Sequence, residues 1–69
     1  MKETLIAQDW NNNKTEFMRG DRVLFHDDNG ETRYGVLGFC SDHSLHVHFE
    51  DGSIAWKEPE ACELSNFRS

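Results

Sequence analysis

Five short apolar segments lie between residues 20 and 64, and each is bounded by residues that favour turns. In chain order they are Val23–Phe25, Tyr34–Cys40, Leu45–Phe49, Ile54–Trp56 and Cys62–Leu64. They are too short for typical helices and are rich in β-branched and aromatic residues, which favour strands. The pattern therefore predicts an all-β domain built from five antiparallel strands.

The clearest strand is predicted at residues 45–49. Leu45, Val47 and Phe49 alternate with two histidines, and a period of two places these apolar side chains on one buried face. The dipeptide Asp51-Gly52 follows at once and is a strong signal for a tight hairpin. The third and fourth strands are thus expected to pair across this turn.

Two glycines interrupt the second apolar segment. Gly35 and Gly38 predict sharp bending or a bulge in that strand, which is how a five-stranded sheet curls up on itself. Pro59 predicts a single 3₁₀ turn before the last strand. We expect a strongly bent five-stranded antiparallel barrel of the SH3-like kind.

With 69 residues, the chain has enough apolar side chains for one domain. We place the barrel at residues 18–65, an N-terminal arm at 1–17 and a tail at 66–69. For the arm, the sequence leaves three outcomes open: Leu5, Ile6 and Trp10 are compatible with a short helical turn, with an extra strand, and with an arm that packs Trp10 onto the barrel. The first few residues are expected to be disordered.

Four segments resemble the Tudor-like branch of SH3-like barrels. They are Gly20–Val23, Gly35–Val36, Val47–Ser53 and Pro59–Leu64. The resemblance covers most of the predicted barrel and implies the same fold. It also implies a ligand class, because Tudor domains of this branch read methylated lysine or arginine in an aromatic cage.

The residues that match the cage positions of that family are Phe25, Tyr34, Phe49 and Trp56, with Asp51 as a neighbouring acid. Such a cage turns the negative faces of its rings toward a quaternary ammonium group, and this attraction is worth about 2 kcal/mol when desolvated. Phe49 and Trp56 also stand at the spacing of a barrel core. The residues alone therefore leave a cage and core packing both open.

A second resemblance is to the plasmid-borne type II dihydrofolate reductases, short SH3-like chains that form a tetramer around a pore. The similar segments are Gly20–Val23, Gly35–Cys40 and Gly52–Ile54. That family carries Val-Gln-Ile-Tyr where this chain has Ile54–Lys57, so the Gln and Tyr that hold cofactor and substrate are missing. This resemblance implies a shared architecture, with a homo-oligomeric small-molecule-binding barrel as one functional alternative, but not the activity.

Charge narrows the class of partner. The chain has 13 acidic and 7 basic side chains, a net charge of −6, which repels phosphate backbones and makes nucleic acid an improbable ligand. Glu58, Glu60 and Glu63 predict an acidic rim that attracts a basic partner. We expect a non-enzymatic module that binds a protein or peptide, basic or methylated, through exposed aromatics and this rim.

A nucleic-acid-binding barrel of the KOW type is the main alternative. Its candidate contacts are four cations, with Tyr34 and Trp56 available for base stacking. The cations are Arg19, Arg22, Arg33 and Lys57.

No motif predicts catalysis or a cofactor. His46 and His48 are a weak metal pair, since zinc takes three or four ligands. Cys40 and Cys62 lie in apolar patterns and are expected to be reduced core thiols. The sequence has no signal peptide and no transmembrane run, which predicts a cytoplasmic protein without a membrane partner.

Overall fold

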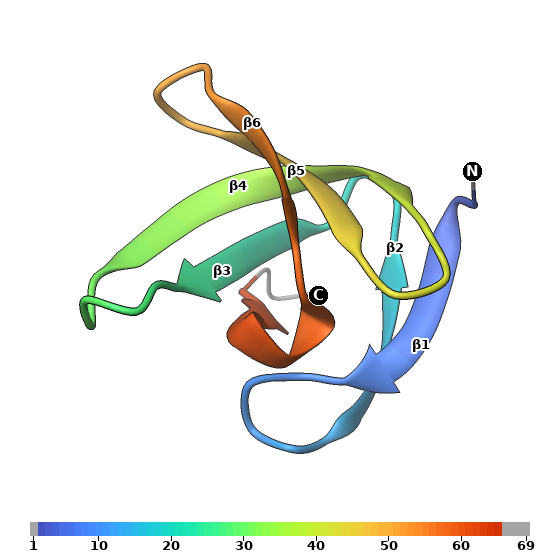
Figure 1. The fold of residues 1–69 in the computed structure, drawn as a ribbon. Helices are drawn as coiled ribbons and strands as arrows, with labels where there is room; N and C mark the ends of the chain where they lie inside the picture. Colours follow the sequence, from blue (N-terminus) through green and yellow to red (C-terminus); the bar gives the residue numbers. More distant parts are fainter. Residues whose placement is uncertain (1, 66–69) are drawn as a thin grey trace.

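The computed structural model describes residues 2–65, and these form two antiparallel β-sheets (Figure 1). A hairpin comprises β1 (Thr4–Gln8) and β2 (Lys14–Met18). The second sheet has the strand order β6-β5-β4-β3-β7. Its strands are β3 (Arg22–His26), β4 (Thr32–Cys40), β5 (Leu45–Phe49), β6 (Ile54–Lys57) and β7 (Cys62–Leu64). The 3₁₀ helix η1 (Pro59–Ala61) connects β6 to β7.

The all-β, antiparallel prediction is confirmed. The five predicted strands are β3 to β7, and the 3₁₀ turn begins at Pro59 as expected. In the described part of the chain, hydrogen bonds do not close the five-stranded sheet, because β6 and β7 stand at opposite ends of the strand order. The predicted tail at 66–69 lies outside the described residues. No helix between residues 2 and 65 is long and apolar enough to cross a membrane.

Strand β4 bends at the glycines, as predicted. Its register with β5 shifts between Leu37 and Phe39, so the bulge lies at Gly38. Gly35 has a different role, since a Cβ atom there would lie 2.5 Å from Val47 Cγ1. The missing side chain lets the inner face of β4 approach β5 closely.

The predicted arm is an integral β-hairpin, so the structure has an extra pair of strands and not a helical turn at this place. The backbone groups of Lys2 and Cys40 exchange two hydrogen bonds of 2.8 Å, and Trp10 N–H donates to the Cys62 carbonyl at 2.8 Å. These contacts tie β1 to the ends of β4 and β7. Phe17, in β2, is fully buried, and the predicted boundary between residues 17 and 18 falls inside that strand.

One core fills the space between the hairpin and the five-stranded sheet. The predicted inward phase of β5 is confirmed, because its alternate apolar residues are all buried. Within the described residues, the buried apolar side chains of the core are those of Phe17, Val23, Phe25, Leu37, Cys40, Leu45, Val47, Phe49 and Cys62.

Both cysteines are free thiols inside this core. Burial raises the pKa of the Cys62 thiol to about 12 and also raises the pKa of Cys40. Since the thiolate is the reactive form, we expect iodoacetamide at pH 8 to modify the native protein about a hundredfold or more slowly than the unfolded chain. Mass spectrometry of timed samples measures this ratio, with protein in guanidinium as the control. Equal rates in both conditions would contradict the buried placement.

Candidate functional site

The candidate site is the side of the five-stranded sheet that faces away from the core, which we call the outer face. It is formed by residues that alternate with the buried ones along each strand. The name refers to Arg22, Tyr34, Val36, His46, His48, Ile54 and Trp56; Leu24 and Phe39 lie on the same side and are half-buried.

Strand register brings these side chains into adjacent rows. His48 lies opposite Val36 of β4 and also opposite Ile54 of β6. His46 lies opposite Trp56, and the two ring centroids are 4.8 Å apart. Directly opposite residues have Cβ atoms about 5 Å apart, so the rows form one continuous surface across β4, β5 and β6.

The apolar residues of the outer face are strongly exposed. The exposed fractions are 46% for Tyr34, 45% for Val36, 53% for Ile54 and 46% for Trp56. Singly scattered apolar residues are normal on protein surfaces, so the notable feature is that these four lie on one side of neighbouring strands, with His46 and His48 between them.

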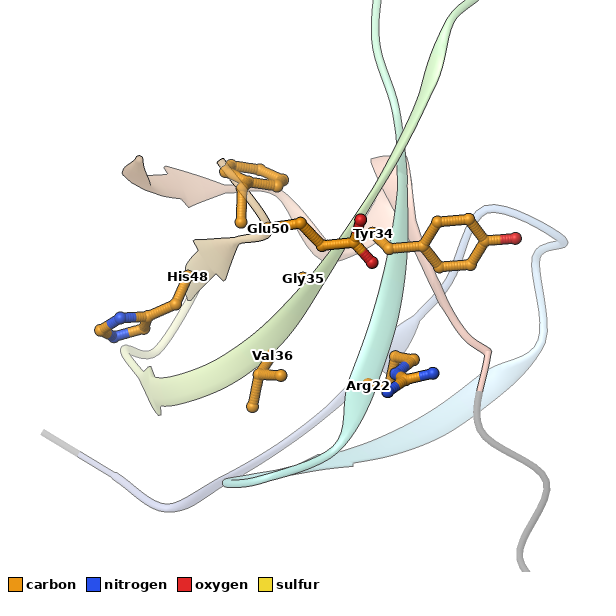
Figure 2. A pocket seen from close by; sticks show the side chains of 7 residues that line it. Arg22, Tyr34, Gly35, Val36, His48 and Glu50 are labelled. Atoms are coloured by element: carbon orange, nitrogen blue, oxygen red, sulfur yellow. The ribbon is translucent and has the colours of Figure 1, made fainter. Parts of the chain in front are cut away.

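A shallow hollow of about 300 Å³ opens on the outer face. Figure 2 shows Gly35 and Val36 at its centre, with His48 on one side and Arg22 with Tyr34 on the other. Within residues 2–65, neither Arg22 nor Glu50, which also lines the hollow, forms an ion pair. The volume of the hollow is at the lower end of the range for ligand pockets. The charges of Arg22 and Glu50 are both available to a ligand.

The two predicted metal candidates belong to the outer face. The His46 and His48 rings meet edge to face at 5.0 Å, and a Cβ on Gly38 would lie 2.7 Å from His48 Nε2. The bulge glycine thus makes room for the imidazoles. Between residues 2 and 65, no three His, Cys, Asp or Glu side chains are grouped closely enough to hold a metal ion.

Two of the predicted cage rings lie in the core. Phe25 and Phe49 are buried, and their ring centroids are 6.0 Å apart. Each is covered by a cation of the chain itself: Lys57 Nζ lies 4.4 Å from the Phe25 centroid and Arg33 Cζ lies 4.0 Å from that of Phe49. These cations occupy ring faces that a methylated ligand would need.

The other two cage rings are elsewhere. Lys57 turns inward onto Phe25, so its neighbour Trp56 must point outward by strand alternation, where it contacts His46. Tyr34 is exposed and lines the hollow together with Phe49. The structure therefore brings Phe25 and Phe49 together and places Tyr34 near Phe49, but separates Trp56 from Phe25.

Asp51, the predicted acid of the cage, is engaged in the β5–β6 turn. Its carboxylate accepts hydrogen bonds from the Ser53 backbone N–H at 2.9 Å and from Arg33 Nη2 at 3.0 Å. The hydrogen bonds from Ser53, and to a smaller extent the charge of Arg33, hold the pKa of Asp51 below its usual value. This acid shapes the turn.

The predicted acidic rim divides into two parts. Glu58 and Glu60 are exposed. Glu63 is half-buried and accepts a 2.7 Å hydrogen bond from Asn11 Nδ2, and its Oε2 atom lies 3.7 Å from His26 Nε2. Glu63 therefore anchors the β1–β2 turn, and Glu58 and Glu60 remain as the accessible rim.

The structure also shows where the four cations proposed for nucleic-acid binding lie. Arg19 lies over the Phe39 ring at 4.9 Å, while Arg33 and Lys57 cover Phe49 and Phe25. Arg22 alone of the four belongs to the outer face. Three of the four are thus engaged with rings of the chain.

Sequence reasoning singled out Trp56 and Tyr34 but missed Val36 and Ile54 as members of a common surface. Ile54 shares the phase of Trp56, and the alternation of β5 already marked the histidines as outward, so these signals were present.

No protein-family model, no curated protein sequence and no solved structure matches this chain. The function must therefore be inferred from the geometry of the outer face.

Proposed function

We propose that this protein is a non-enzymatic SH3-like domain that binds a protein or peptide on its outer face. The observation that carries the proposal is the grouping of Tyr34, Val36, Ile54 and Trp56 on one side of the sheet, each nearly half exposed or more. A few large side chains, tryptophan and tyrosine among them, carry most of the binding energy at protein interfaces.

The strand topology is the observation that supports the SH3-like part of this proposal. Strands β3 to β6 form a meander in which neighbours in sequence are neighbours in space, and β7 returns beside β3 after a 3₁₀ turn. The long β4 bends at Gly38. These features are what an SH3-like barrel requires of a five-stranded sheet.

A protein partner fits the outer face better than a nucleic acid does. The chain has a net charge of −6, and Arg22 is the only arginine or lysine among the outer-face residues. A phosphate backbone needs several cations in a row for affinity at physiological salt. Exposed apolar and aromatic side chains around a small hollow suit a peptide with an apolar anchor.

A peptide-display selection on the folded protein tests the proposal. We expect the enriched peptides to bind the wild type and to lose affinity by about thirtyfold or more for the double variant Ile54→Thr/Trp56→Thr, the effect of removing about 2 kcal/mol of hot-spot contact. Circular dichroism verifies that the variant is folded. Affinities are measured by fluorescence polarisation with labelled peptides.

The hairpin offers a matched control. Ile6 and Met18 are also exposed, 57% and 38%, but they lie outside the five-stranded sheet. The variant Ile6→Thr/Met18→Thr removes similar apolar area and should bind the selected peptides like the wild type. If the two double variants lose affinity equally, or if no peptide is enriched, the outer face is not a peptide-binding surface.

A further inference from the structure

Strand β6 forms one edge of the five-stranded sheet and, among residues 2–65, pairs only with β5. The other edge strand, β7, is partly engaged, because Trp10 N–H from the hairpin donates to the Cys62 carbonyl at 2.8 Å. An uncovered edge presents a row of backbone donors and acceptors that can pair with another strand.

The hydrogen-bond pattern shows which backbone groups of β6 face this edge. At the hairpin turn, Phe49 N–H donates to the Ser53 carbonyl at 2.8 Å. In an antiparallel pair, hydrogen-bonded and non-hydrogen-bonded residue pairs alternate. The register from this point places the next hydrogen-bonded pair at Val47↔Ala55 and the following one at Leu45↔Lys57.

Ala55 and Lys57 therefore use their backbone groups on β5, and those of Ile54 and Trp56 turn to the open edge. Within residues 2–65, neither Ile54 nor Trp56 has a backbone hydrogen bond to any other segment. The same two residues carry the exposed apolar side chains of the outer face. Ile54 and Trp56 thus present both free backbone hydrogen-bonding groups and exposed apolar side chains to a binding partner.

We infer that β6 accepts an extended basic segment of a partner protein as an added strand. This inference rests on the proposed function and states how the partner binds. Every second side chain of the added strand would lie beside Ile54 and Trp56, so the segment carries apolar residues at alternate positions. Backbone pairing supplies affinity, and these alternate positions supply selectivity.

The charges at the C-terminal end of β6 select a basic segment. Glu58 and Glu60 come directly after β6. Both are exposed and, in the described part of the chain, neither forms an ion pair. Lysine or arginine residues at the end of the incoming segment that lies beside them would complement these acids.

The same acids favour a basic partner over a second copy of this chain as the occupant. A second β6 paired antiparallel would place residues 50–53 of the other copy beside the Glu58 end of β6. That segment contains no lysine or arginine, so a second copy would not complement these acids.

Hydrogen exchange and NMR titration test the inference with a defined probe, the blocked peptide Lys-Arg-Thr-Val-Thr-Val-Thr-Lys-Arg. In the free protein we expect the amides of Ala55 and Lys57 to exchange slowly and those of Ile54 and Trp56 to exchange fast. At saturation with the probe, the Ile54 and Trp56 amides should become protected as well. Persistently fast exchange of both amides in the saturated complex would overturn strand addition.

Backbone N-methylation of the probe separates strand pairing from side-chain docking. One version is methylated at its two Val residues and the other at two of its Thr residues, so side chains and charges are the same. In a strand, only one of these two sets of N–H groups faces β6, so one version should bind about tenfold more weakly and the other like the parent probe. Equal affinities would show that no strand is added.

Further variants test the charge claim. Glu58 makes no side-chain cap to η1, so Glu58→Gln/Glu60→Gln should keep the fold. It should weaken binding of the basic probe by about two- to tenfold, the effect of two exposed ion pairs. A probe with Glu at the four basic positions should bind more weakly still. If the acidic probe binds as well as the basic one, the partner is not selected by charge and the inference fails.

Two outcomes distinguish the inference from the proposed function. If Ile54→Thr/Trp56→Thr abolishes binding of selected peptides but no edge amide becomes protected, the outer face binds peptides without strand addition. If the edge amides are protected without a peptide and the mass in solution is that of a dimer, the occupant is a second copy and the inference is wrong.

Discussion

Replacing Phe17 with alanine should lower the free energy of unfolding by about 3–5 kcal/mol. Phe17 is fully buried and is the member of the core that β2 contributes. A domain of this size has a total stability of roughly 3–10 kcal/mol, so the variant should be largely unfolded or close to it. Urea denaturation followed by tryptophan fluorescence measures the change.

Ile6→Ala is the matched control for this prediction. Ile6 lies on the same hairpin but is 57% exposed, so its loss should cost less than about 1 kcal/mol. A Phe17→Ala protein that unfolds at the same urea concentration as Ile6→Ala would show that the hairpin is not part of the core. The expected difference would establish that residues 1–17 cannot be removed as a dispensable arm.

Replacing Gly35 with alanine is the second large effect, with an expected loss of about 2–3 kcal/mol or more. The new Cβ would lie 2.5 Å from Val47 Cγ1 and 2.8 Å from the backbone oxygen of His48. Neither neighbour can move without separating β4 from β5 or displacing the core. Thermal denaturation followed by circular dichroism should show a clearly lower Tm.

Gly38→Ala tests whether the expected stability loss of Gly35→Ala comes from lack of space at that position and not simply from replacing a glycine in β4. A Cβ on Gly38 would also be close to a neighbour, at 2.7 Å from His48 Nε2. That neighbour is the far end of an exposed side chain that can rotate away, so the cost should stay below about 1 kcal/mol. Equal losses for the two variants would contradict the explanation by close packing of β4 against β5.

Much of the five-stranded sheet could be predicted because its signals are local. The alternation at residues 45–49 and the Asp51-Gly52 turn are both contained in a few consecutive residues, and both are confirmed. The bulge at Gly38 and the 3₁₀ turn at Pro59 depend equally on single residues. Such features do not require knowledge of distant segments.

The hairpin of β1 and β2 was harder to recognise. Its exposed side carries an apolar residue, Ile6, so the alternation that marks a half-buried strand is blurred. The sequence did contain a turn signal in Asp9 and the three asparagines at 11–13. In the structure Asn12 has a positive φ of 63°, and the Asp9 carboxylate accepts hydrogen bonds from the backbone N–H groups of Asn11 and Asn13. Asparagine and aspartate in this arrangement favour a tight turn between strands as much as the end of a helix.

The sequence by itself determined which five segments form the strands of the main sheet and which face of β5 is buried, since these depend on turn residues and a period of two. Only the tertiary structure decided which aromatic residues become neighbours. Trp56 and Lys57 are adjacent in the chain but point to opposite faces of β6, so one joins the outer face and the other covers Phe25. Strand register between distant segments sets these contacts, and no local pattern contains it.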